Sequence, residues 1–441
     1  MNTAALPFVL SMREALQTAR LPGSGIGWLD SARAEAMQSF LANGLPTTRN
    51  ELWKYTALRA LSQRAYAARD EQAATRAIDE SASALPGIDG PRLVFVNGAF
   101  HADLSKLDAL PQGLSLMPLS QALADQPEPL RFLLARRPQG NADAFASLNI
   151  ALASDGALLR ITAGAQIEAP VHLVHIGAAA DHDVAWHSRG YVEIGENASL
   201  RLIEHHVGAG ENTHFANLAC DVVLRERASL DLVIVQDVAS GTTLLRRTDF
   251  DLRDDARVTL HALELGGALT RHEIRAMLDG DRARFESRGA FALRARQHAD
   301  TELLIEHRGR DTASDALWRG VADDRARGVF HGAITVAQGA DGADAKLSNK
   351  NLLLSRDAEI DTRPVLEIHA DEVKAAHGAT VGQLDERTLF YLRSRGINAE
   401  DARILLVRAF CAAALSRIEP QALREHIEML LLAHLPKQIA P

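Results

Sequence analysis

The chain has 441 residues, of which 47% are hydrophobic and 24% are charged, and its formal net charge is -9. This length exceeds one compact core and predicts two or three structural units. The acidic balance argues against a broad nucleic-acid surface, because phosphate contacts need clustered Lys and Arg. No apolar run is long enough to span a bilayer. The opening residues, 1–7, lack the layout of a secretory signal, so we expect a cytoplasmic protein that binds neither nucleic acid nor membrane.

Cysteine usage agrees with a reducing compartment. Two cysteines are present, Cys220 and Cys411, and they lie far apart in the sequence. They are too few for a disulfide framework, and no CxxC motif occurs. The chain alone therefore lacks the cysteine-rich ligand set of a stable iron–sulfur site.

The N-terminal third predicts helices and a small connector. Residues 11–67 indicate helices broken by loops, and residues 44–56 are a proline turn that leads into Trp53 and Tyr55. We interpret these aromatic residues as packing for a small helical domain rather than as a binding site. Residues 92–98 then predict a short strand that ends in a turn. Helical pieces follow, and this small α/β region carries no evident chemistry.

The middle of the chain, from residue 157 to about residue 368, shows short apolar alternation interrupted by Gly, Asn and Asp. Its turns share one form: a polar residue or Gly, then Ala, then any residue, then an aliphatic or aromatic one. The alanines lie 33, 30, 28 and 27 residues apart, at Ala165, Ala198, Ala228, Ala256 and Ala283. A small residue at a recurring corner, followed by an alternating strand, predicts a coiled solenoid of short strands. A β-sandwich is the structural alternative, and the lack of long helical segments argues against a βαβ fold.

Histidines in this region offer little sign of a metal site. His205 and His206 are neighbours, and adjacent residues of a strand point to opposite faces, so they cannot easily share one metal ion. With His214 they are expected in a solvated turn. Glu306 and His307 alternate in the same way. Neither GxSxG nor HExxH occurs, although an outer groove of carboxylates, as a β-helix enzyme acting on sugars would need, stays possible from the sequence.

Two further histidines, His369 and His377, flank the turn where the sheet pattern ends, eight residues apart. A structural donor role is the simpler interpretation of such residues. Imidazole can also bind iron, or a thiolate-bound cluster, as one member of a shared site. No cysteine is near in the sequence, so the other ligands would come from a partner.

The C-terminal residues predict three helices. Asp385 caps a helix that stops at Gly396, Asn398 begins the next, and Pro420 opens the third. An open solenoid end leaves backbone groups unpaired and must be covered, so we expect the N-terminal unit and these helices to act as caps. The run at residues 389–395 mixes apolar, aromatic and basic side chains, as interfaces do. A cap alone and a cap with a docking role are both consistent with this pattern.

Several long segments of the sequence resemble segments of a known protein family. They are GLPTTRNELWKYT at 44–56, TRPVLEI at 362–368, HGATVG at 377–382 and LFYLRSRG at 389–396. The chain resembles the SufB/SufD family of SUF iron–sulfur cluster assembly components, on its SufD side, because SufB is the cysteine-rich member. The resemblance implies a mainly β protein: a right-handed parallel β-helix at 151–378, an N-terminal helical and small α/β region at 1–150, and a C-terminal helical domain at 379–441.

The resemblance also implies a function. Members of the SufD side are non-ATPase scaffolds that pair with SufB through their β-helices, and each of the two docks a SufC ATPase through its C-terminal helices. Nascent clusters form transiently at the SufB–SufD interface, so this chain would not be an enzyme and would hold no stable cofactor alone. A structural SufC adaptor that never contacts iron is an alternative, as is a stand-alone β-helix carbohydrate-active enzyme. A homodimer is possible for the isolated chain.

Residue roles follow from the same resemblance. The histidine before Gly-Ala-Thr is His377, the candidate cluster or metal ligand at the subunit interface, and His369 is a weaker candidate. SufC docking maps to the C-terminal region around Phe390, Tyr391, Arg395 and Gly396. Many members have Cys two residues before the histidine, and this chain has Ala375 there, which leaves His377 without a neighbouring thiolate.

Overall fold

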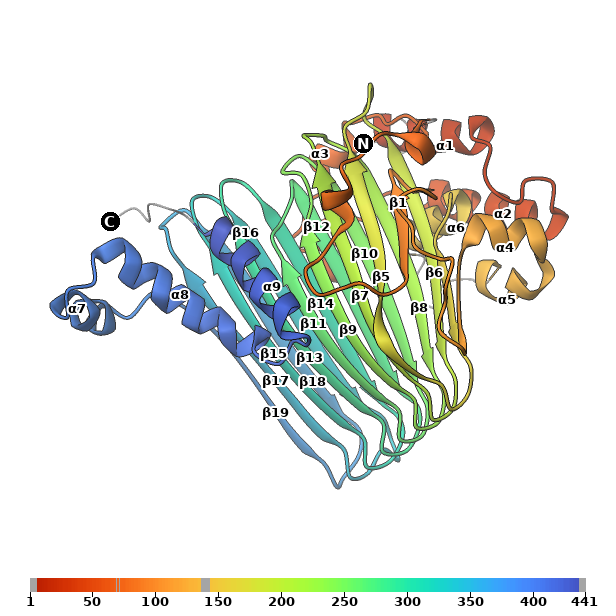
Figure 1. Cartoon of the computed structure of the whole chain (residues 1–441). Helices are drawn as coiled ribbons and strands as arrows, with labels where there is room; N and C mark the ends of the chain where they lie inside the picture. The colour runs from red at the N-terminus through yellow and green to blue at the C-terminus, as the bar shows by residue number, and fades with distance from the viewer. Residues whose placement is uncertain (1–5, 69, 71, 136–142, 436–441) are drawn as a thin grey trace.

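The computed structural model describes residues 6–68, 70, 72–135 and 143–435. The opening residues 1–5 used in the signal-sequence argument lie outside this description. A long stack of strands dominates the molecule, with helices gathered at its N-terminal end and along one side (Figure 1). Within the described residues, none of the helices has the length and apolar character to cross a membrane.

Helices precede and follow the strands. The N-terminal ones are α1 (Pro7–Thr18), α2 (Gly27–Asn43), α3 (Arg59–Ser62), α4 (Leu119–Asp125), α5 (Arg131–Leu134) and α6 (Ala144–Leu152). Short 3-10 turns lie among them: η2 (Glu51–Trp53), η3 (Ala73–Thr75), η4 (Glu80–Ser83) and η5 (Glu128–Leu130). The C-terminal helices are α7 (Glu386–Ser394), α8 (Ala399–Leu415) and α9 (Gln421–His434). Asp385 and Asn398 cap α7 and α8 with their side chains, as predicted.

The strands form two sheets. The ten-stranded sheet has the order β19 (Lys374–Gly382), β17 (Asp344–Leu353), β15 (Ala313–Ala322), β13 (Arg284–Leu293), β11 (Arg257–Glu264), β9 (Ser229–Asp237), β7 (Ser199–Ala209), β5 (Gln166–Ala178), β1 (Arg92–Val96) and β2 (Ala99–Phe100). The nine-stranded sheet has the order β18 (Glu359–Ile368), β16 (Arg327–Val336), β14 (His298–His307), β12 (Leu269–Leu278), β10 (Thr243–Leu252), β8 (Phe215–Leu224), β6 (Ala185–Ile194), β4 (Ala157–Ile161) and β3 (Leu114–Pro118).

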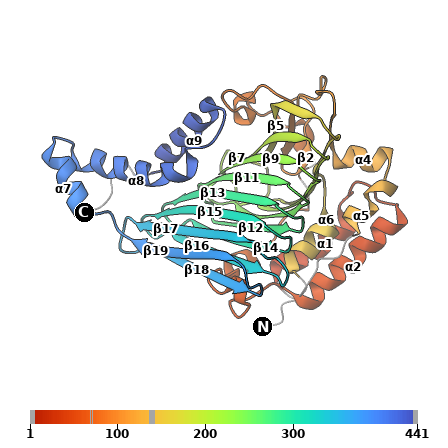
Figure 2. The ribbon, with the colours of Figure 1, turned by 90° about the horizontal axis from the view of Figure 1, so that it is seen from below.

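Successive strands alternate between the two sheets, so each coil of the chain adds one strand to each (Figure 2). From β4 and β5 onward every pairing is parallel and in register, apart from a shift in β5 between Ile167 and Val171. Antiparallel pairing links β1 to β2 and β3 to β4 at the N-terminal end. This arrangement confirms the predicted parallel β-helix and rules out the β-sandwich.

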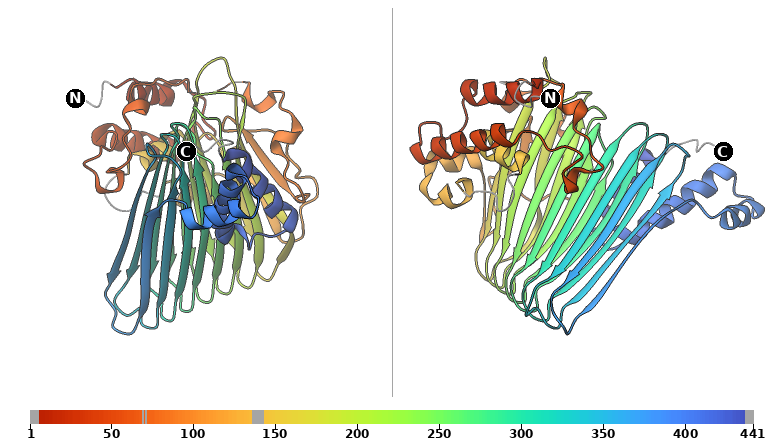
Figure 3. Two further views of the ribbon diagram at one scale, coloured as in Figure 1. Left: turned by 90° about the vertical axis from the view of Figure 1, so that its left-hand side faces the viewer. Right: turned by 180° about the vertical axis from the view of Figure 1, so that it is seen from behind.

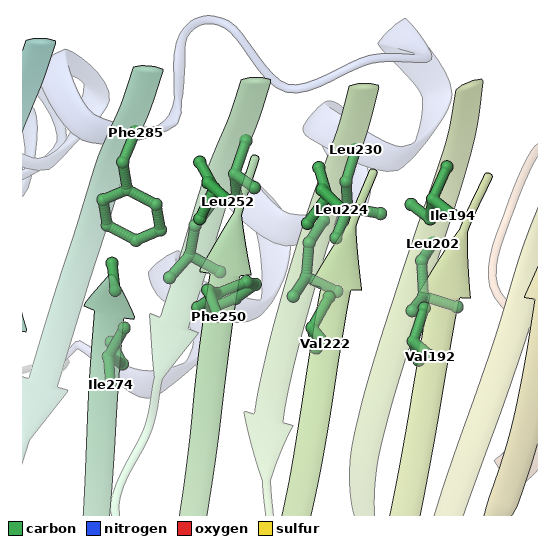
Figure 4. Packing of buried hydrophobic residues seen from close by; sticks show 14 of the residues in the cluster. Val192, Ile194, Leu202, Val222, Leu224, Leu230, Phe250, Leu252, Ile274 and Phe285 are labelled. Carbon is green, nitrogen blue, oxygen red and sulfur yellow. The ribbon is translucent and has the colours of Figure 1, made fainter. Parts of the chain in front are cut away.

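The core fills the space between the two sheets. Alternate residues of each strand point inward, and aliphatic and aromatic side chains at equivalent positions stack from coil to coil (Figure 4). Leu224, Leu252 and Leu278, for example, occupy matching positions on β8, β10 and β12 and have no exposed surface. Each coil therefore buries its apolar face only against its neighbours, as a solenoid requires.

The recurring alanines sit at the corners where the nine-stranded sheet hands over to the ten-stranded one. Ala198, Ala228, Ala256 and Ala283 are at most 1% exposed. The residue before each is in the left-handed conformation, with φ of 55° at Asn197, Arg227 and Asp255 and 59° at Arg282. The corner thus needs one residue with positive φ, followed by a side chain small enough for the tight inside of the turn.

The two ends of the solenoid differ. Helices α8 and α9 pack on the outer face of the ten-stranded sheet (Figure 3). Val407 and Ile427 of these helices belong to one buried cluster with Val233 and Leu263 of the sheet. Within the part of the chain that the structure describes, they leave the last coil uncovered, and most residues of β18 and β19 are exposed or half-buried. The expectation that the C-terminal helices close the solenoid end was therefore wrong, because their apolar faces bury against the flank of the sheet instead.

We expect Ala256→Leu to lower the free energy of unfolding by about 1–3 kcal/mol, because the corner has no room for three more carbon atoms. Ala34→Leu, on the exposed face of α2, serves as a control and should change stability by less than about 0.5 kcal/mol. Urea denaturation of both variants measures the difference. Equal stability of the two would contradict the corner assignment.

Candidate functional site at the open end of the solenoid

The last coil presents the free edges of two sheets side by side. Among the described strands, β18 pairs with β16 alone, and β19 pairs with β17 alone. On β18 the amides of Glu359 and His369 donate toward β16, to the carbonyls of Ala326 and Val336. Backbone amides alternate in direction along a strand, so the N–H groups of the even-numbered residues of β18 point toward the free edge.

The two free edges are not equivalent. Pro364 occupies one of the edge-facing positions of β18 and has no N–H to donate there. On β19 the amide of Lys374 donates to Ala343 of the neighbouring coil, which turns the odd-numbered amides outward. These belong to Ala375, His377, Ala379 and Val381, and none is a proline. The β19 edge is therefore the better template for a further strand.

His377 lies on the interior face of this last coil. It is aligned with Leu347 of β17, a 4% exposed core residue, so its side chain follows the inward row of the stack. No further coil covers it, and the residue is exposed. Ala375 lies in the same inward row and packs against the core. It occupies the position where the family resemblance predicts a cysteine.

His369 occupies a different place on the same coil. It directly follows β18, its backbone N–H donates to Val336, and its side chain is exposed at the corner before β19 begins. His377 is the fourth residue of β19, about 10 Å along the strand from its start. Among the described residues, no group of three or more His, Cys, Asp or Glu side chains is arranged to hold a metal ion.

A polar ladder that the sequence analysis missed supports the coil beneath His377. Asn349 and Asn351 of β17 point into the solenoid and are 0% and 2% exposed. The Asn351 amide donates to the Asn349 side-chain oxygen at 2.6 Å, and the Thr362 hydroxyl of β18 donates to the same oxygen at 2.7 Å. This bond joins the two sheets at the last coils. Two asparagines spaced two apart on a strand share one face, which is the signal that could have revealed them.

Helix α7 presents the second group of candidate residues. Leu389 is buried, whereas the next two side chains, Phe390 and Tyr391, are 73% and 56% exposed. The guanidinium of Arg395 lies 5.3 Å from the centre of the Tyr391 ring. Gly396 ends the helix with a φ of 90°, a conformation that favours glycine. The candidate docking residues thus share one helix, away from the solenoid core.

The histidines of the middle region are buried, and not in a solvated turn as expected. His205 and His206 do point to opposite faces of β7: His206 stacks on His175 inside the solenoid, at 5.0 Å between ring centres, and His205 stacks on His172 outside it. His214 accepts a hydrogen bond at Nδ1 from the Val184 N–H and donates one from Nε2 to the Ala178 carbonyl. Their roles are structural.

The solenoid interior also contains an ionic cluster. Burial alone would raise the pKa of Glu204, but the Arg246 guanidinium and the His206 ring hold that pKa well below its usual range. Arg246 reaches His272 as well, and the other ring nitrogen of His272 lies 2.9 Å from Glu264. An Arg donor on one ring nitrogen makes His272 a neutral imidazole that donates to Glu264. Such satisfied networks fix one arrangement of the coils but add little net stability.

The fold and the site define a class of protein: a β-solenoid whose last described coil, β18 and β19, has free sheet edges, followed by a helical arm with exposed aromatic side chains. Two family models match the chain. The SUF system FeS cluster assembly, SufBD core domain matches residues 175–410, and the SufBD protein N-terminal region matches residues 18–173.

Relatives agree with these models. The chain is 30% identical to the iron–sulfur cluster assembly protein SufD of Escherichia coli over 91% of its own length and 92% of that protein. It is 31% identical to a SufBD family protein of Synechocystis over 85% and 84% of the two lengths, and 26% identical to SufD of Bacillus subtilis over 64% of each. The chain belongs to the SufBD family of the SUF iron–sulfur cluster assembly system.

The buried histidines make the stability of the protein depend on pH. Burial lowers the pKa of His187 to about 3, whereas it is near 6.5 in the unfolded chain. Below pH 6.5 the unfolded state therefore binds a proton that the folded state does not, and stability falls as the pH falls. Between pH 7 and pH 5 this one group should cost about 2 kcal/mol.

The variant His187→Gln, which carries no titratable group, should lose correspondingly less stability between these two pH values. Urea denaturation of both proteins at pH 7 and pH 5 gives the comparison. An identical pH dependence for the variant and the unchanged protein would contradict the assignment of His187 as a buried neutral imidazole.

Proposed function

We propose that this chain is a non-ATPase scaffold subunit of the SUF system that pairs with SufB through the open end of its β-helix. The observation that carries the proposal is the unpaired β19 edge with His377 on the interior face beside it. Strand addition to such an edge supplies main-chain hydrogen bonds along its whole length. It also removes an exposed edge that would otherwise pair unspecifically.

Pairing at this edge puts His377 between the two subunits. A nascent iron–sulfur cluster is the cargo of this interface, and His377 is the ligand that this chain contributes. Imidazole nitrogen binds iron alongside thiolates, and SufB is the subunit proposed to supply those thiolates. Ala375 provides no thiolate, so the contribution from this side is a single nitrogen. His369, at the exposed corner, is a second and weaker candidate.

The ATPase SufC docks on the C-terminal helices in this proposal. Phe390 and Tyr391 supply exposed aromatic area, and Arg395 supplies a charge beside Tyr391. Aromatic residues and Arg are enriched in interfaces. When two SufC subunits dimerise on ATP, they draw the two helical arms together, and the strain opens the cluster site between the β-helices. The chain itself breaks no covalent bond.

His377→Ala should reduce the iron content of the anaerobically purified complex with SufB and SufC at least several-fold, because the variant removes the nitrogen ligand. The mass of the complex should stay the same, since the β19 backbone is unchanged. His369→Ala is the matched control and should have the smaller effect. An intact complex with full iron content would leave this chain as a purely structural adaptor.

Tyr391→Asp should weaken SufC binding at least tenfold and leave the pairing with SufB unchanged, because α7 lies apart from the β19 edge. Met429→Asp, a substitution on α9 at a residue that is 59% exposed, is the control for an added charge on the same helical arm. Native mass measurement of the co-expressed subunits shows which contact is lost. Loss of SufB together with SufC, or no loss at all, would contradict the assignment of α7.

A further inference from the structure

A segment between helices α2 and α3 is fixed on the outer face of the nine-stranded sheet. Trp53 is 8% exposed, and the Arg271 guanidinium of β12 lies 4.1 Å from the centre of its ring. The Thr56 hydroxyl donates to the Asp300 carboxylate of β14, a residue that is 1% exposed. These contacts confirm the packing role predicted for Trp53. They also hold residues 51–56, here called the strap, in one place.

The strap runs across the strands toward the free edge of the sheet. Its last residue, Thr56, is bound to β14, and its first residue, Glu51, forms an ion pair with Arg363 of β18. Strands β14, β16 and β18 are neighbours and lie about 4.8 Å apart. The strap therefore contacts the sheet from β12, through Trp53, to β18, its outermost strand, through Glu51.

The edge end of the strap is open to solvent. Leu52 is 37% exposed, and the Glu51 side chain keeps 65% of its accessible surface in spite of the ion pair. Carboxylates outnumber guanidiniums around it. Four acidic side chains, Glu51, Glu359, Asp361 and Glu367, lie on β18 and at this end of the strap, together with three basic ones, Arg327, Arg363 and Lys54 of the strap. The acidic side chains around Leu52 favour a partner that has basic residues, and Leu52 itself favours an apolar contact.

Backbone pairing is weakest at the same place. Pro364 has no N–H to offer at the free edge of β18, so a strand laid beside β18 gains fewer main-chain hydrogen bonds than one laid beside β19. Side-chain contacts must then supply more of the attraction on this side. The strap is the element of the described structure that an ion pair places directly over that position.

We propose that Glu51 and Leu52 form a lip that receives the partner strand beside β18, with Leu52 against an apolar side chain and Glu51 against a basic one. The occupant is the SufB subunit of the proposed function, on which this inference rests. The lip lies on the outer face of the sheet, and so it is separate from His377, which lies on the inner face.

The test measures the affinity of the purified chain for SufB by analytical ultracentrifugation, with two variants of the lip. Leu52→Asp and Glu51→Lys should each weaken the complex at least tenfold. Leu10→Asp is the matched control, since Leu10 is 39% exposed on α1, and it should bind as the unchanged chain does. Circular dichroism and thermal unfolding should show the same fold in all three, because the substituted side chains are exposed.

A fourth variant separates this proposal from the one on which it rests. Ala379→Pro removes an edge-facing N–H of β19 without touching a hydrogen bond to β17, and it should abolish the complex. If Ala379→Pro abolishes binding while Leu52→Asp and Glu51→Lys bind normally, the lip is overturned and edge pairing stands. If Ala379→Pro binds normally, edge pairing itself is overturned, and the lip with it.

Discussion

Hydrogen bonding between successive coils is the constraint on which this structure depends. Every strand from β4 and β5 to β16 and β17 is bonded on both sides, and no coil can satisfy its own backbone or bury its own apolar row without its neighbours. A stack of this kind has two ends by necessity. The N-terminal end receives β1, β2 and β3, whereas in the described residues the C-terminal end stops at β18 and β19 without a cover. The unpaired edge is thus a consequence of the fold, and His377 lies next to it.

The features of the open end can be understood together from this constraint. The asparagine ladder of β17 fixes the geometry of the coil on which His377 stands. Pro364 makes the two edges unequal, and the strap adds side chains on the side where backbone pairing is weaker. Helices α8 and α9 bury their apolar faces against the flank of the ten-stranded sheet, which leaves the end free, and α7 projects away from the strands (Figure 1). The proposed function needs this division, because it assigns subunit pairing to one surface and ATPase docking to another.

Much of the fold could be predicted because it repeats. The alanine corners reveal the coils, since a positive φ followed by a buried small residue recurs from Gly164 to Ala283. The opposite facing of His205 and His206 follows from the two-residue period of a strand. Their burial could not be foreseen, because it depends on His175 and His172 stacking from the next strand. Side-chain capping preferences also predict a helix start at Asp30, and this is wrong, because Asp30 lies in the first turn of α2, which begins at Gly27.

The site was predictable only in part, for a physical reason. Family motifs marked His377 and the α7 residues, and a strand pattern ending in a helix marked the last coil. The free edge itself depends on where α8 and α9 pack. Their apolar faces indicate that these helices are buried on one side, but they do not specify the surface that covers them. Contacts such as Glu51 with Arg363, 312 residues apart, and Trp53 with Arg271 are fixed by the folded sheet. Local sequence patterns do not contain them.

Hydrogen exchange along β19, with and without SufB, tests the central claim most directly. In the free chain the amides of Ala375, His377, Ala379 and Val381 face solvent at the sheet edge and should exchange quickly, while the alternate amides bonded to β17 exchange slowly. Strand pairing predicts that these four become protected in the complex, by at least tenfold. Unchanged exchange in a complex of the correct mass would contradict the account and place the subunit contact elsewhere.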